Sequence, residues 1–136
     1  MIEPFNSRFI SPTKDFRRLS VLFAINESPE NSQNDIGEKT NLSSSMVNNY
    51  IKDFKQESLI TVTGATNRTQ NYFLTDKGRA VLSELLMGYS AEIVQLYSTV
   101  KHEISQILGG FYDEGIRTVV LFGAAETAEI VHAAIK

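Results

Sequence analysis

The chain has 136 residues, of which 42% are hydrophobic and 21% are charged, a balance that is typical of a folded protein and excludes a disordered chain. It contains no cysteine, which excludes disulfides, thiol nucleophiles and cysteine zinc sites and predicts a reducing, cytoplasmic location. The net charge of −3 counts mildly against a nucleic-acid partner, but residues 1–75 are neutral overall and residues 76–136 carry all the excess acid.

The first third of the chain predicts two helices separated by a polar loop. Residues 11–13 (Ser-Pro-Thr) offer an N-cap and a first-turn proline, and apolar residues follow them at helical spacing up to Ala24. Residues 26–34 are rich in Ser, Asn, Glu and Pro, which indicates a loop. Ser32 and Asp35 resemble a capping box and predict a short second helix through Ile36 to about Lys39. A tight turn at residues 41–43 follows.

A third helix is predicted from about Ser44 to Gln56, capped by Ser43. Its apolar residues are spaced by three and four positions, which places them on one face of the helix. These residues are Val47, Tyr50, Ile51 and Phe54. The opposite face is polar and carries Ser44, Ser45, Asn48, Asn49, Lys52 and Lys55.

Two short β-rich runs come next, at residues 59–63 and 72–74, and they predict a hairpin with an exposed tip at about residues 65–68. Thr75 then caps a long helical region, which Gly88 is expected to kink and residues 113–115 to end. Apolar residues repeat along this region in a near-heptad pattern with one stutter. They are Leu82, Leu86, Tyr89, Ile93, Leu96, Val100, Ile104, Ile107 and Phe111.

The last residues predict a β-α unit. Residues 118–122 are β-branched and apolar, as a buried strand requires. A turn at residues 123–126 and a helix from about Thr127 to Lys136 follow. The predicted fold class is therefore mostly α with a small β-hairpin (α+β).

Three segments resemble MarR-type and related transcriptional regulators. They are the turn into the third helix at residues 42–47, the exit from that helix at residues 56–60, and Leu74-Thr75-Asp76-Lys77-Gly78, which resembles the family's "LTxKG" ending. The helix exit has Ser58 where the family usually has Gly. The resemblance covers about residues 13–90 and implies a winged helix-turn-helix in residues 1–85. The domains predicted after it are a helical dimerisation or linker region at 86–115 and the first β-α unit of a truncated Rossmann-like domain at 116–136.

In such a fold the third helix enters the major groove of double-stranded DNA, where Asn pairs with adenine and Lys reaches guanine or phosphate. The predicted DNA-binding residues of this helix are Ser43, Ser44, Ser45, Asn48, Asn49 and Lys52. At the hairpin tip, Asn67 and Arg68 are predicted to enter the minor groove or to hold phosphate. The alternatives are an ordinary amphipathic helix with a solvated face and a solvated arginine in a turn.

A second resemblance lies in residues 119–128, which are similar to the first strand, turn and helix of a Rossmann-like nucleotide-binding domain. It implies phosphate binding at the helix N-terminus by Gly123, Ala124, Ala125, Glu126 and Thr127. Ala125 and Ala128 replace the second and third glycines of GxGxxG. One βα unit cannot build a parallel sheet, so we expect a longer native chain, with a nucleotide or dinucleotide effector.

The apolar seam of residues 82–111 predicts a homodimer, because so small a fold offers too little core to cover the seam within one chain. The alternative is that the seam is intrachain core. No zinc hydrolase is expected, since His102-Glu103 lacks the second histidine of HExxH. No apolar run approaches the roughly 18 residues of a membrane span.

The main hypothesis is a homodimeric, sequence-specific DNA-binding transcriptional regulator that is not an enzyme. The alternatives are a Rossmann-like enzyme, such as a nucleotide-sugar enzyme with an accessory winged helix, and a winged helix used for protein contacts.

Overall fold

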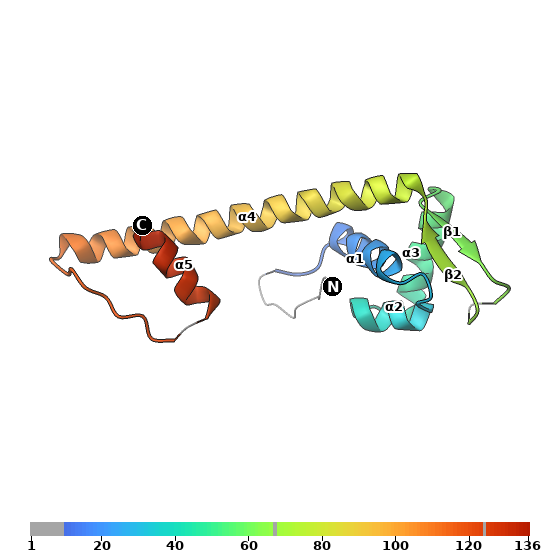
Figure 1. The fold of residues 1–136 in the computed structure, drawn as a ribbon, viewed down its shortest axis with the longest axis horizontal. Helices are drawn as coiled ribbons and strands as arrows, with labels where there is room; N and C mark the ends of the chain where they lie inside the picture. Colours follow the sequence, from blue (N-terminus) through green and yellow to red (C-terminus); the bar gives the residue numbers. More distant parts are fainter. Residues whose placement is uncertain (1–9, 67, 124) are drawn as a thin grey trace. The chain divides into compact units, whose positions relative to one another are not determined.

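The computed structural model describes residues 10–66, 68–123 and 125–136, and the chain divides into two units, one up to Tyr89 and one from Ser90 onward. Over the described residues there are five helices and one two-stranded sheet (Figure 1). In chain order these elements are α1 (Lys14–Glu27), α2 (Gln33–Thr40), α3 (Ser44–Gln56), β1 (Ile60–Thr63), β2 (Asn71–Leu74), α4 (Asp76–Asp113) and α5 (Glu126–Ile135).

Each of the first three helices begins at the polar residue that its sequence offers as a cap. The Thr13 hydroxyl accepts a hydrogen bond from the Phe16 amide at 3.1 Å, which opens α1. The predicted capping box of α2 is confirmed, because the Asp35 amide donates to Ser32 Oγ at 3.2 Å and the Ser32 amide donates to Asp35 Oδ2 at 2.8 Å. These side chains satisfy amides that have no partner within the helix.

The core of the first unit lies where α1, α2 and α3 meet the hairpin. Tyr72 of β2 and Phe54 of α3 are its largest fully buried side chains. The apolar face predicted for α3 is confirmed as buried, so the opposite face of this helix is left toward solvent. The other buried apolar residues of this core are Leu19, Val21, Leu22, Ala24, Ile25, Ile36, Val47, Tyr50, Ile51, Leu59, Ile60 and Leu82.

The hairpin is the wing of the predicted fold. Its strands pair antiparallel, with Ile60 opposite Leu74 and Thr63 opposite Asn71. The Tyr72 amide also donates to the carbonyl of Pro29 at 3.0 Å, which ties β2 to the loop between α1 and α2. The predicted strands are confirmed to within a residue at their ends.

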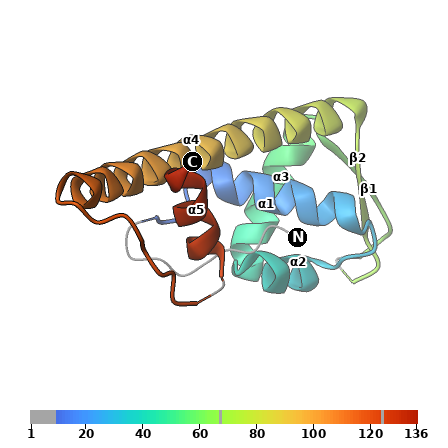
Figure 2. The same ribbon diagram turned by 60° about the vertical axis from the view of Figure 1, so that its left-hand side comes forward.

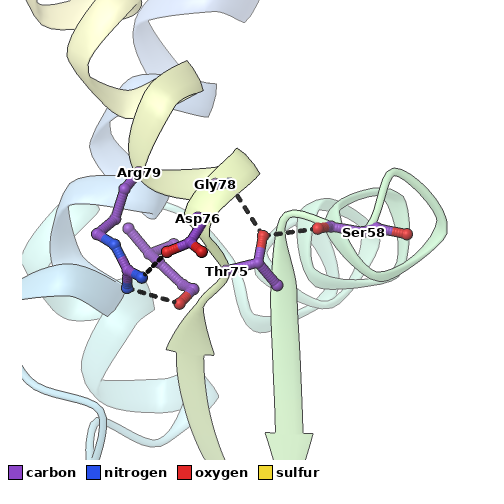
Figure 3. A network of polar contacts seen from close by, with 6 residues as sticks. Ser58, Thr75, Asp76, Gly78 and Arg79 are labelled. Atoms are coloured by element: carbon purple, nitrogen blue, oxygen red, sulfur yellow. Dashed lines mark hydrogen bonds and ion pairs between the residues drawn. The ribbon is translucent and has the colours of Figure 1, made fainter.

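The wing joins α4 through a network of polar contacts between side chains and backbone (Figure 3). Ser58 has φ +60°, the left-handed conformation that favours glycine, which the family usually places there. The Thr75 hydroxyl donates to the Ser58 carbonyl at 2.7 Å and accepts from the Gly78 amide at 3.0 Å, so it caps α4 as predicted. Lys77 Nζ donates to the Glu57 carbonyl at 2.9 Å. The Leu-Thr-x-Lys-Gly segment thus fastens the end of α3 and the start of β1 to the start of α4.

In the second unit, the C-terminal end of α5 meets α4 (Figure 2). Ser105 Oγ donates to the Ala134 carbonyl at 3.0 Å, and Ala134 is buried. The helix α4 continues through Gly88 without a break and ends at Asp113, where residues 113–115 were predicted to end it.

The strand predicted at residues 118–122 is wrong, because this segment has no regular structure. Val120 is 89% exposed and Phe122 is fully exposed. A strand needs a neighbour that accepts and donates its backbone hydrogen bonds, and the only sheet of the described residues is the two-stranded wing. The helix predicted to follow is present as α5, but a loop and a helix do not make the predicted start of a Rossmann-like sheet.

Candidate nucleic-acid interface

The exposed face of α3 holds most of the residues predicted to bind DNA. Ser44, Ser45, Asn49 and Lys52 are exposed, and Asn48 is half-buried. Ser43 is exposed too, but its hydroxyl caps α3 by accepting from the Met46 amide at 3.3 Å. Because the buried face of the same helix is anchored in the core, the polar side chains have a rigid support.

Asn48 is held by a residue that sequence reasoning missed. Gln33, the first residue of α2, has its side-chain nitrogen 3.5 Å from Asn48 Oδ1 and 3.3 Å from the Tyr72 hydroxyl. The Tyr72 hydroxyl in turn donates to Gln70 Oε1 at 3.2 Å. No pattern in the sequence marks Gln33, because its role depends on α2, α3 and the wing meeting in space.

An ion pair joins α1 to the C-terminal end of α3. Arg18 of α1 donates to both oxygens of Glu57, at 2.7 and 2.5 Å, and its guanidinium lies 5.2 Å from the centre of the Phe54 ring. The hydrogen bonds from Arg18 hold the pKa of the Glu57 carboxyl below its ordinary value, and those same bonds raise the pKa of Arg18. Asp53 adds to the field at Arg18.

The two lysines of α3 face solvent. Lys52 and Lys55 are exposed, and no ion pair of either is found within the part of the chain that the structure describes. Glu57, the residue that caps the end of α3, is thus paired with Arg18, while the lysine charges face solvent. An overall charge of −3 is compatible with a local surface that attracts phosphate.

At the tip of the wing, Arg68 is exposed, as predicted, whereas Asn67 lies outside the described residues. The tip is closed by Thr66 and Thr69, since the Thr69 amide donates to the Thr66 carbonyl at 2.9 Å. Gly64 enters the tip with φ +98°, a conformation that disfavours side chains. The turn presents Arg68 to solvent.

The apolar seam of α4 lies open in the single chain. Its middle residues are between 41% and 59% exposed: Ile93, Leu96, Val100, Ile107 and Phe111. Ile104 is half-buried. The alternative that the whole seam is intrachain core is therefore wrong for these five residues. Leu82 at its start is core, with 6% exposure.

The residues predicted to hold a nucleotide phosphate lie around the start of α5. Gly123 has φ +104° and Ala125 stands at the N-cap, with no side-chain hydrogen bond there. Glu126 and Thr127 begin the helix, and Ala124 lies outside the described residues.

On α4, the Gln106 amide nitrogen lies 3.0 Å from His102 Nε2, and Gln106 stands at the position where HExxH has its second histidine. Among the described helices, none is long and apolar enough to cross a membrane.

A family model described as winged helix-turn-helix matches residues 17–88, more than half of the chain. The chain belongs to the winged helix-turn-helix family. No curated protein sequence matches it significantly. The match covers the three helices, the wing and the first turns of α4, which are the elements that present the polar face of α3.

Solved structures of transcription regulators, among them a MarR family protein, share this fold. MepR, a transcription regulator of the Staphylococcus aureus multidrug efflux pump MepA, is 18% identical, with 72% of this chain and 75% of MepR covered and a TM-score of 0.53. A probable transcriptional regulator from Pseudomonas aeruginosa is also 18% identical, with 81% of each chain covered and a TM-score of 0.55. A MarR family protein from Mycobacterium tuberculosis is 13% identical, with 75% and 77% covered and a TM-score of 0.52. The predicted winged helix-turn-helix fold is confirmed.

Proposed function

We propose that this protein binds double-stranded DNA in a sequence-specific manner and regulates transcription. The observation that carries the proposal is the exposed polar face of α3, which is capped by Ser43, supported by the core and flanked by the wing. A groove about 12 Å wide admits such a helix. The similarity in fold to transcription regulators supports this proposal over an enzyme, and the missing strand at residues 118–122 removes the main reason for a Rossmann-like one.

Within this surface, each residue type has a distinct chemical use. Asn49 is exposed and makes no side-chain hydrogen bond within the described part of the chain, so both its amide oxygen and its amide nitrogen are available to an adenine edge. Lys52 reaches guanine or phosphate. Ser44 and Ser45 lie at the positive end of the helix dipole, where phosphate is favoured.

The test is selection of bound DNA from random or genomic fragments by the whole chain. Asn49→Ala should weaken binding to the selected site by about 1–3 kcal/mol, with the loss confined to one base-pair position. The matched control is Asn26→Ala, which removes an exposed asparagine from the end of α1 and should leave affinity unchanged. Failure of the wild-type chain to enrich any sequence would overturn the proposal.

We further propose that the regulator is a homodimer joined through α4. Five large apolar side chains along one seam are open in the single chain, and their near-heptad spacing keeps them facing a partner helix. Two copies would place two α3 helices on successive turns of DNA, about 34–36 Å apart.

Ile93→Asp and Leu96→Asp should give monomers in sedimentation and much weaker DNA binding. The control Met87→Asp changes an apolar residue that is 74% exposed and lies off the seam, and it should leave the dimer intact. A wild-type chain that sediments as a monomer at tens of micromolar would contradict the dimer. A nucleotide effector at residues 123–127 stays a prediction, for which the turn at Gly123 and the start of α5 are the available groups.

A further inference from the structure

The neighbouring residues Asn48 and Asn49 of α3 differ in their burial and hydrogen bonding. Asn49 is exposed and has both amide groups open to solvent, whereas Asn48 is half-buried and its side-chain oxygen is engaged by Gln33 at 3.5 Å. The two residues therefore do not offer the same groups to a ligand, although the sequence presents them as equivalent.

The direction of this contact follows from the groups around it. The Tyr72 hydroxyl has one hydrogen, and it donates that hydrogen to Gln70 Oε1 at 3.2 Å. It must then accept at its other contact, which is the nitrogen of Gln33 at 3.3 Å. The two hydrogens of this nitrogen serve Tyr72 and Asn48, so Asn48 receives with its oxygen and keeps its own Nδ2 hydrogens for an outside partner.

The support behind this arrangement is rigid. Tyr72 is fully buried in the core and sits on β2. Gln33 is fixed at the first position of α2 by the capping box of Ser32 and Asp35. The amide of Asn48 is therefore oriented from α2 and the wing together, and not by α3 itself.

We infer that Gln33 is a specificity-determining residue, because it turns the Asn48 side-chain oxygen toward α2 and leaves the Nδ2 hydrogens for an outside partner. This inference rests on the proposed DNA-binding function. An asparagine that pairs with adenine needs its oxygen for N6 and its nitrogen for N7. With its oxygen turned toward Gln33, Asn48 presents its Nδ2 hydrogens and selects an edge that accepts, which in the major groove is guanine or thymine O4. Asn49, with both groups open, is the residue for adenine.

The test changes the chemistry of residue 33 and measures base preference at one position. That position is the one whose preference disappears in Asn48→Ala. Gln33→Glu replaces the donor nitrogen by an acceptor, so the Asn48 amide turns to donate to it and presents its oxygen to the groove. Preference at that position should change from guanine or thymine to cytosine or adenine, by about tenfold or more.

Two variants separate this effect from charge and from folding. Asn34→Asp adds the same negative charge to the first turn of α2 at an exposed residue, and it should weaken all sites equally without changing base preference. Gln33→Met removes the amide without charge and should reduce discrimination at the Asn48 position only. It should also shift the Asn48 side-chain amide signals in an NMR spectrum of the free protein.

Unchanged base preference in both Gln33 variants, with the wild-type chain binding its site, would overturn the inference and leave the proposed function standing. Unshifted Asn48 amide signals in Gln33→Met would overturn it without reference to DNA, which keeps the test decisive if Gln33→Glu does not fold. A wild-type chain that binds no DNA would overturn both the proposed function and the inference.

Discussion

Adding one methyl group at Gly78 should destabilise the protein, whereas the same change at Gly88 should stabilise it. Both glycines lie within α4, where alanine is favoured over glycine by about 0.8–1 kcal/mol. At Gly88 a Cβ atom would meet nothing within 4 Å. At Gly78 it would overlap the Leu59 carbonyl oxygen and lie 3.0 Å from the carbonyl carbon. The obstacle is backbone, so no side-chain rotation relieves it.

The magnitude follows from what must move. Separating α4 from the segment before β1 lengthens the hydrogen bond from the Thr75 amide to the Leu59 carbonyl, now 2.9 Å, and the one from Thr75 Oγ1 to the Ser58 carbonyl, now 2.7 Å. Each contributes about 1 kcal/mol, and overpacking adds about 1–3 kcal/mol. After the gain in helix propensity, we expect Gly78→Ala to destabilise the protein by about 2–4 kcal/mol and Gly88→Ala to stabilise it by about 0.5–1 kcal/mol.

Urea denaturation followed by circular dichroism measures both variants, and equal protein concentrations are needed because dimerisation adds to apparent stability. The slope of the free energy of unfolding against urea should not change, since both variants bury the same surface. If Gly78→Ala were as stable as Gly88→Ala, the close approach of α4 to Leu59 would be wrong. The proposed role of the Leu-Thr-x-Lys-Gly segment in fixing the wing would then be wrong too.

Two further predictions concern charge. Arg68→Ala should weaken binding to related DNA sites about equally and lower the salt slope by about one, because an exposed arginine at the tip neutralises phosphate; a loss limited to one base position would contradict this. The pKa of Glu57 is lowered by hydrogen bonds from Arg18, and that of Asp35 by hydrogen bonds from Ser32, so both carboxylates stabilise the fold above their unfolded pKa values. This stability should be lost as the pH falls below about 4, and thermal melting of Glu57→Gln should depend less on pH over that range than melting of the wild type.

Local signals in the sequence were sufficient for the elements of the first unit. Thr13, Ser32 and Ser43 mark the starts of three helices because a hydroxyl that accepts an amide within one turn is a short-range interaction. The buried face of α3 followed from the spacing of its apolar residues. These predictions depend on neighbours within a few positions, which the sequence displays directly.

Predictions that depended on distant partners were less successful. Residues 118–122 have the composition of a strand, but strand formation requires a second strand, and composition does not supply one. Asn48 and Asn49 looked equivalent because both belong to the polar face of α3. Only the meeting of α2 with the wing shows that Gln33 engages one of them.

Contacts from three other helices fix the position of α3 in the first unit. Arg18 holds the C-terminal end of α3 through Glu57, Lys77 holds the Glu57 carbonyl, and Gln33 holds Asn48 near the N-terminal half. These three contacts come from α1, α4 and α2, so every other helix of the first unit reaches the helix proposed to read DNA. DNA bound to α3 would therefore contact a helix that has little freedom to rotate. Fixed geometry of this kind is what Asn48 needs in order to present its Nδ2 hydrogens, because a side chain that selects guanine or thymine by a single hydrogen bond discriminates only if its direction is set beforehand.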